Sequence, residues 1–153
     1  MLSVMAKTAS APPTTPELAS RLRLSVLRLA RRLRQHAPLD VTPSQLSALT
    51  TIVREGRLTL SQLAEIERVK PPTVTRIVDA LGQRDLVTRV VDDDDRRVAW
   101  VAPTTAGRTL VDTIRRRRDA YLAEHLRTFS AEDRELLARA ADLLERLIED
   151  PEP

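Results

Sequence analysis

The sequence has no cysteine, and its 153 residues include only two histidines, three glycines and three aromatic residues. Without a thiol, the chain cannot form disulfides, thiolate zinc sites or cysteine-based redox switches. Two histidines far apart in the sequence leave little from which to build a nucleophile with its base, or a metal cluster. We therefore expect no enzyme activity, no cofactor and no metal site.

Long apolar runs are also missing from the sequence. No stretch approaches the roughly 20 residues that a membrane-spanning helix needs, and the first residues lack the apolar core of a signal peptide. Residues 1–14 are predicted to form a disordered tail. Residues 15–150 are predicted to form one domain, which is long enough to bury a core. The sequence thus predicts a soluble, cytoplasmic protein with no membrane partner.

Lysine is scarce as well. Only Lys7 and Lys70 are lysines among the 25 basic residues, which leaves 23 arginines, and the formal net charge is only +3. Guanidinium groups bind phosphates and guanine edges in bidentate fashion, so this bias suits a nucleic-acid partner. A genome rich in G and C, which favours arginine codons, explains the same bias at least as well.

Two capping boxes mark the starts of two helices in the first half of the chain. In each, a Thr is followed three residues later by a Gln, at Thr42–Gln45 and at Thr59–Gln62. The helix after Thr42 has an apolar stripe, and Gly56 follows it where a left-handed C-terminal cap belongs. The helix after Thr59 must end before Pro71, because proline cannot continue a helix that has already formed its hydrogen bonds.

Pro71 can instead begin the next helix of a helix-turn-helix that spans about residues 59–84. Four apolar residues follow the i, i+3, i+4, i+7 pattern and must face the core: Val74, Ile77, Val78 and Leu81. Helical geometry then places four residues on the opposite face, namely Pro72, Arg76, Asp79 and Gln83. Thr73 and Thr75 lie on the flanks of this face. A polar face with one long cation is typical of a recognition helix that enters the major groove of DNA.

Two β-prone runs within residues 86–101 flank a charged tip that reads Asp92-Asp93-Asp94-Asp95-Arg96-Arg97. Asp95 and Arg97 are two residues apart, so on a strand edge they can lie on one side and pair. Such a pair could hold Arg97, with Arg96 beside it, extended towards a minor groove. Taken alone, such a tip is more often a solvated turn that keeps a strand edge from aggregating. Directly behind a helix-turn-helix, a DNA-binding wing is the better interpretation.

Three long helices are predicted at about residues 16–36, 104–126 and 130–149, and the first and last of them carry more apolar surface than a small core needs. We therefore expect them to form a dimer interface, with these residues in it: Leu22, Val26, Leu136, Leu143 and Leu147. The run from Arg115 to Arg118 covers all sides of a helix, which favours ion pairs with acids over a phosphate-binding patch.

The predicted arrangement resembles the MarR family of bacterial transcription regulators over about Leu18 to Ile148. The motifs that carry this resemblance are Leu60-Ser61-Gln62-Leu63-Ala64, Pro72-Thr73-Val74-Thr75-Arg76-Ile77-Val78, Leu86-Val87-Thr88-Arg89, and Asp95-Arg96-Arg97 followed by Thr104-Thr105-Ala106-Gly107. It implies a mainly α fold: a winged helix-turn-helix with a two-stranded β wing and long N- and C-terminal dimerisation helices.

The resemblance also implies a function. A homodimeric repressor would present two winged helices to a palindromic double-stranded DNA operator. Residues matching Pro72, Thr73, Thr75 and Arg76 would meet the major groove, Arg97 would enter the minor groove, and Asp95 would brace Arg97. Many members are released by small aromatic acids or phenols bound between the dimer and DNA-binding regions. His36, near the end of the first helix, is close to where family pockets lie, but a lone His there is usually a cap or a surface group.

Two residues depart from the family pattern. Asp85 stands where the family usually has Gly, and Asp tolerates a left-handed conformation better than most residues. Pro103 stands where the family usually has Leu, which predicts that strand pairing stops early there.

One other function is compatible with the fold, namely a protein-interaction module that uses a winged helix without binding DNA. Arg76 and Arg97 argue against it, because such a module has no need of cations at both the groove-facing position and the wing tip.

Overall fold

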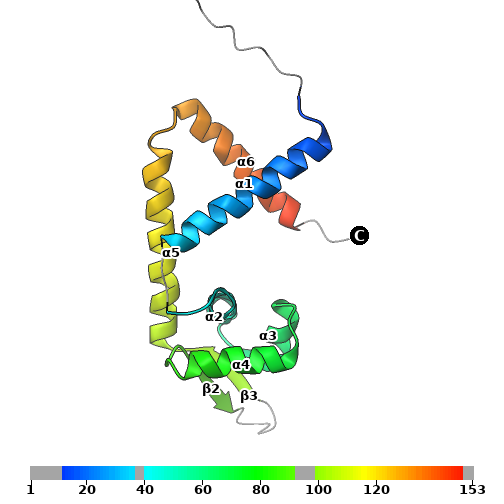
Figure 1. Ribbon diagram of the computed structural model, residues 1–153. Helices are drawn as coiled ribbons and strands as arrows, with labels where there is room; N and C mark the ends of the chain where they lie inside the picture. Colours follow the sequence, from blue (N-terminus) through cyan, green and yellow to red (C-terminus); the bar gives the residue numbers. More distant parts are fainter. Residues whose placement is uncertain (1–11, 37–39, 92–98, 150–153) are drawn as a thin grey trace, which may run out of the picture. The chain divides into compact units, whose positions relative to one another are not determined.

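The computed structural model describes residues 12–36, 40–91 and 99–149 (Figure 1). The chain divides into two units, Met1–Gln35 and His36–Pro153. The first contains α1 (Thr15–Gln35). The second contains α2 (Pro43–Glu55), β1 (Leu58–Thr59), α3 (Leu60–Ile66), α4 (Pro71–Gly82), β2 (Val87–Val91), β3 (Ala99–Pro103), α5 (Thr105–Leu126) and α6 (Ala131–Glu149). The prediction of a mainly helical chain with a small wing sheet is confirmed.

Both predicted capping boxes are formed. At α2, the backbone N–H of Thr42 donates to Gln45 at 2.9 Å, and the Gln45 N–H donates to the Thr42 hydroxyl at 3.3 Å. At α3, the same two bonds join Thr59 and Gln62, at 2.9 and 3.2 Å. Each box satisfies two N–H groups that a helix start would otherwise leave unpaired.

The start of α1 lies one residue earlier than predicted. Thr15 is already helical, and the Leu18 N–H bonds to the carbonyl oxygen of Thr14, so Thr14 precedes the first turn. The backbone N–H and the hydroxyl of Thr14 both donate to the Glu17 carboxylate, at 2.9 and 2.8 Å. These two bonds, the backbone one first, lower the pKa of Glu17, because they stabilise its charged form.

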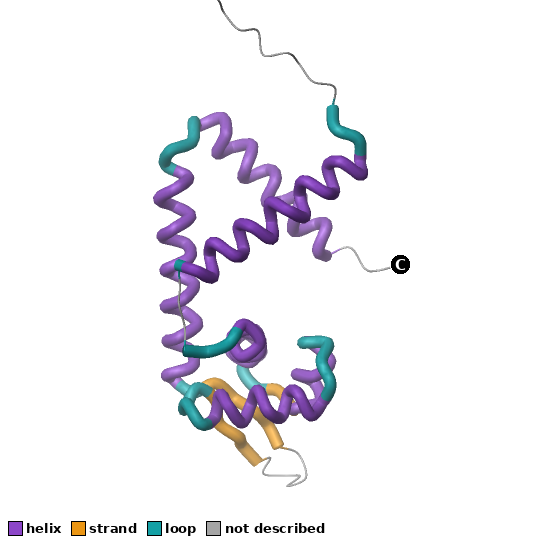
Figure 2. The backbone as a smooth tube through the Cα atoms, in the orientation of Figure 1, coloured by secondary structure: helices purple, strands orange, loops and turns teal. Residues whose placement is uncertain are grey.

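The sheet has three antiparallel strands in the order β1-β3-β2, and Figure 2 shows them beside α4 and the start of α5. The sequence predicts β2 and β3 but not β1, whose two residues pair with Trp100 and Val101. The prediction that pairing stops before Pro103 is wrong, because Pro103 is the register partner of Val87. Since β1 reaches only Trp100 and Val101, one edge of β3 is open at Pro103, and a residue without an N–H is tolerated there.

The core lies in the second unit, between α2, α3, α4 and the sheet. Its largest fully buried side chains are Leu49, Ile52, Leu63, Leu81, Val74, Val78 and Val101. Three of the four residues predicted to face inward from α4 are buried, and the fourth, Ile77, is partly buried against them. The period of the apolar residues therefore gives the orientation of α4 correctly.

Two turns use positive φ angles. Asp85, after α4, has φ 57°, which agrees with the left-handed conformation expected where the family has Gly. Gly56, after α2, has φ 82° and ψ −50°; its φ is positive, as predicted, but its ψ is not that of a left-handed helix.

The start of α5 is fastened to the junction between α4 and β2. The Thr104 N–H donates to the Leu86 carbonyl oxygen at 3.1 Å, and the Thr104 hydroxyl donates to the Asp85 carbonyl oxygen at 2.6 Å. The same hydroxyl accepts the N–H of Gly107 at 3.0 Å. A Cβ on Gly107 would overlap the Leu86 carbonyl oxygen and would lie 3.2 Å from a methyl group of Leu49. Only glycine allows this approach.

We predict that Gly107→Ala destabilises the protein by about 2–3 kcal/mol, since the new methyl group meets backbone in a filled core. Urea unfolding at fixed protein concentration measures the loss. Asp85→Gly is the matched control: it removes a left-handed non-glycine residue and should leave stability unchanged or raise it by up to about 1 kcal/mol. Equal stability of Gly107→Ala and the wild type would contradict the close approach.

Candidate DNA-binding surface

The turn between α3 and α4 is held from the side of α2. Glu67, which follows α3, accepts a hydrogen bond of 2.6 Å from the hydroxyl of Thr51, a residue that is only 6% exposed. Arg68 then has φ 51°, and this left-handed residue lets the chain reverse within four residues. The start of α4 is thereby fixed relative to the core.

The first turn of α4 is built on two prolines. Pro71 and Pro72 occupy the first two helical positions, where a missing N–H costs no hydrogen bond. The next two N–H groups, of Thr73 and Val74, both donate to the Lys70 carbonyl oxygen, at 2.9 and 3.3 Å. The helix thus begins without a capping side chain.

The outer face of α4 and Gln83, which directly follows the helix, carry the residues predicted for the major groove. Those that are exposed are Pro72, Thr73, Arg76 and Gln83. Thr75 differs: it is half-buried, and its hydroxyl donates to the Pro71 carbonyl oxygen at 3.1 Å. Within the described part of the chain, no hydrogen bond or ion pair engages Arg76, so its guanidinium group is available to a partner.

Chemically, this face suits base edges. An arginine can donate to guanine O6 and N7, a glutamine can pair with adenine N6 and N7, and the methyl or ring carbons of Thr and Pro can contact a thymine methyl group. The face is short and lies along one helix, as a groove reader requires.

The wing begins with the paired strands β2 and β3. Val91 and Ala99 are register partners, so the strands adjoin where the chain leaves one and enters the other. The predicted wing residues Asp95, Arg96 and Arg97 lie outside the described residues.

An ion pair joins the recognition helix to the wing strands. Arg89 Nη2 on β2 lies 2.6 Å from Asp79 Oδ1 on α4. The sequence places Asp79 on the outer face of α4 and Arg89 in a β-prone run, but nothing in the sequence joins the two. Their pairing depends on how the strand returns along the helix.

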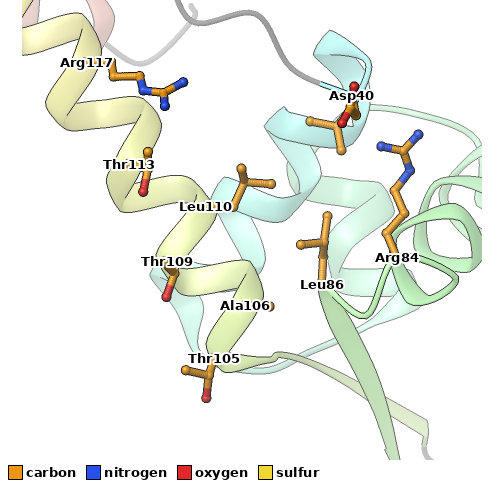
Figure 3. A pocket seen from close by; sticks show the side chains of 10 residues that line it. Asp40, Arg84, Leu86, Thr105, Ala106, Thr109, Leu110, Thr113 and Arg117 are labelled. Atoms are coloured by element: carbon orange, nitrogen blue, oxygen red, sulfur yellow. The ribbon is translucent and has the colours of Figure 1, made fainter.

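A pocket of about 990 Å³ lies between the start of α5, the turn after α4 and the segment before α2 (Figure 3). Its lining residues are Asp40, Val41, Arg84, Leu86, Thr105, Ala106, Thr109, Leu110, Thr113 and Arg117. In the view of Figure 3, Leu110 and Leu86 lie between Arg117 and Arg84, and Asp40 lies on the side of Arg84. The pocket therefore combines apolar walls, hydroxyl groups and two guanidinium groups, of which sequence reasoning did not single out Arg84.

The sequence profile of the MarR family matches residues 41–99. An HTH-type transcriptional regulator of Mycobacterium leprae (strain TN) is 43% identical over 134 residues, which cover 87% of this chain and 94% of that protein. The chain belongs to the MarR family. It is a DNA-binding transcriptional regulator with a winged helix, as the sequence predicts.

Two further proteins agree with this MarR family membership. The HTH-type transcriptional repressor MdtR of Bacillus subtilis (strain 168) is 34% identical over 93 residues, which are 61% of this chain and 60% of MdtR. The structure of a MarR family protein from Bacillus stearothermophilus superimposes with a TM-score of 0.76 at 28% identity, over 87% of this chain and 94% of that one.

MarR family proteins form dimers, and two helices here have the exposed apolar surface that a dimer interface needs. Neither α1 nor α6 has a buried residue. The side chains predicted for the interface are all exposed in the single chain: Leu22, Val26, Leu136, Leu143 and Leu147. Among the residues that the structure describes, no helix has both the length and the hydropathy of a membrane span.

Other polar residues of this MarR chain have local partners. His36 does not line the pocket; its ring stacks on Tyr121, with centroids 3.9 Å apart, and Tyr121 in turn packs against His125. In the arginine run, Arg115 pairs with Asp112 at 3.2 Å, which agrees with the ion-pair interpretation. Arg117, however, faces the pocket (Figure 3).

Proposed function

We propose that this MarR family regulator is a homodimeric repressor that binds a palindromic operator and is released by a small aromatic acid or phenol. The outer face of α4 carries the proposal: Arg76 is exposed and unpaired within the described chain, on the side opposite the buried Val74 and Val78. A two-fold dimer would present two such faces, and a two-fold protein matches a two-fold DNA site.

The proposed DNA contacts divide between two grooves. Pro72, Thr73, Thr75, Arg76 and Gln83 would contact the major groove. Of these, Thr75 would contribute its methyl group more than its hydroxyl hydrogen, which already bonds within the helix. The minor groove would be contacted by the wing residues Asp95, Arg96 and Arg97. Its negative potential attracts arginine, but it offers little sequence information.

Repression is supported by the similarity to MdtR, a transcriptional repressor that matches this chain over 93 residues. Deleting the gene should therefore raise transcription from the promoter that carries the operator. A fall in transcription after deletion would instead identify an activator.

We predict that Arg76→Ala and Arg97→Ala weaken DNA binding in different ways. Arg76→Ala should reduce the free energy of DNA binding by about 1–3 kcal/mol per base contact and relax the base preference at a few operator positions. Arg97→Ala should weaken binding to all duplexes more evenly. It should also reduce the salt slope, which is the slope of the logarithm of the binding constant against the logarithm of the salt concentration, by about one counterion for each phosphate that the arginine neutralises. Fluorescence anisotropy with duplexes selected from a random library, titrated with salt, measures both effects.

Arg54→Ala is the charge-matched control, because Arg54 is exposed on α2 and pairs with the neighbouring Glu55 at 2.7 Å. It should bind like the wild type. If both Arg76→Ala and Arg97→Ala also bound like the wild type, the chain would not read DNA in this way. A wild type that selected no duplex would favour the protein-interaction module.

The dimer should depend on α6. Leu143 and Leu147 are 60% and 68% exposed in the single chain and lie one helical turn apart. We predict that the double change Leu143→Asp and Leu147→Asp dissociates or unfolds the dimer and abolishes operator binding, because it buries carboxylates in an apolar interface. Light scattering at micromolar concentration gives the mass. Ala138→Asp, on the opposite face of α6, should remain dimeric; a monomeric wild type would contradict the proposal.

The effector is proposed to occupy the pocket beside α5. An aromatic ring would pack between Leu86 and Leu110, and its carboxylate or phenolate would pair with Arg117, because in Figure 3 Arg117 lies on the side away from Asp40. Such a ligand would touch both α5 and the turn that follows α4, so its binding can be linked to the position of the recognition helix.

We predict that Arg117→Ala weakens binding of benzoate-type acids by about 10-fold or more, the usual value of a charge-assisted hydrogen bond. Arg84→Ala should have a smaller effect, since Asp40 already lies on its side of the pocket. Thermal-shift titration gives the affinities, and Arg116→Ala, on the same helix but outside the lining, is the control. If a panel of aromatic acids and phenols shifted the melting temperature of neither the wild type nor any variant, the protein would be a repressor without such an effector.

A further inference from the structure

The ion pair between Asp79 and Arg89 spans the two parts of the DNA-binding region. Asp79 is in the last turns of α4, and Arg89 is the third residue of β2, ten positions later in the chain. The bond of 2.6 Å is short, and both side chains are about half exposed, at 51% and 49%. An exposed pair of this kind adds little to folding stability. Its placement gives it another use.

Apolar packing joins α4 to the start of β2. Val87, at the start of β2, is buried together with Val78 and Leu81 of α4. Side chains alternate along a strand, so the next residue on the inner face of β2 is Arg89, whose register partner Val101 is also buried.

A hollow of about 370 Å³ follows at this point, lined by Val78, Asp79, Gly82, Gln83, Val87 and Arg89. Asp79 and Arg89 both line this hollow, so the ion pair joins helix and strand beside it.

We propose that Asp79 and Arg89 are positioning residues for DNA binding, which hold the wing at a fixed angle to the recognition helix. This inference rests on the proposed function, in which α4 and the segment after β2 meet different grooves of one duplex. A small change of angle at Arg89 displaces everything that follows along the strand. Holding that angle before DNA arrives reduces the ordering cost of binding, which is the advantage of preorganisation.

A different role for Arg89 gives opposite results. If Arg89 contacted a phosphate directly, Asp79 would compete with that phosphate and would repel the DNA. Removing Asp79 would then strengthen binding, and removing Arg89 would lower the salt slope. If Arg89 acts only through Asp79, both single changes weaken binding, and neither changes the number of counterions released.

The test measures DNA affinity with duplexes that the wild type selects from a random library, together with urea unfolding of each variant. Asp79→Ala and Arg89→Ala should each weaken binding by about 10-fold, equal to about 1.4 kcal/mol. The double variant, with both residues changed to alanine, should lose no more DNA affinity than either single variant. The charge swap Asp79→Arg with Arg89→Asp should recover most of the affinity. Unfolding midpoints should stay close to the wild type, and Arg54→Ala again serves as the control.

A double-mutant cycle between Asp79 and Arg97 separates positioning of the wing from general destabilisation of the protein. In an Arg97→Ala background, Asp79→Ala should have almost no further effect, because a wing without its groove-binding arginine gains nothing from being held. A merely structural role predicts the same reduction of affinity in both backgrounds. If the charge-swapped protein does not fold, Arg89→Lys should retain binding that Arg89→Gln loses.

Tighter binding by Asp79→Ala, or unchanged binding by Arg89→Ala, would overturn the inference and leave the proposed function intact. A wild-type chain that selects no duplex overturns the proposed function, and this inference with it.

Discussion

The close approach of Gly107 to the backbone of Leu86 is the constraint on which the DNA-binding region depends. Leu86 stands where α4 has ended and β2 begins, and its carbonyl oxygen accepts the N–H of Thr104. Because Gly107 has no side chain, the first turn of α5 can rest directly on this junction. The helix, the wing strands and α5 therefore share one fixed point. The pocket lies beside it, with Leu86 and Ala106 in its wall.

The orientation of α4 follows from the burial of one side. Val74, Val78 and Leu81 are almost completely buried, and burying an apolar side chain of this size is worth about 1.5–3 kcal/mol. Rotating the helix by one position would expose all three. The outer face that carries Arg76 is thus set by the core.

Local signals make most of the fold predictable. The capping boxes at Thr42 and Thr59 and the inward stripe of α4 each depend on residues within a few positions of one another. The strand β1 is not predictable in this way, because its two residues become a strand only by pairing with Trp100 and Val101, some forty positions later. The prediction at Pro103 is wrong for a similar reason: a proline is tolerated or excluded according to whether a neighbouring strand reaches it.

The candidate site is predictable to the same extent. The period of α4 identifies its outer residues, whereas it does not encode the hydrogen bond from the Thr75 hydroxyl to the Pro71 carbonyl oxygen. The Asp79–Arg89 pair and the meeting of Arg84 with Arg117 around one pocket both join separate elements. Such contacts require the path of the chain in space.

The two prolines that open α4 have a consequence for how DNA specificity can change. Helices often bind phosphates through free N–H groups in their first turn, but here Pro71 and Pro72 have none, and those of Thr73 and Val74 are bonded to Lys70. In the proposed complex, the recognition helix can therefore contact DNA only through its side chains. Since Pro72, Thr73 and Arg76 are exposed, the operator could diverge through a few substitutions at these positions on a backbone that stays the same.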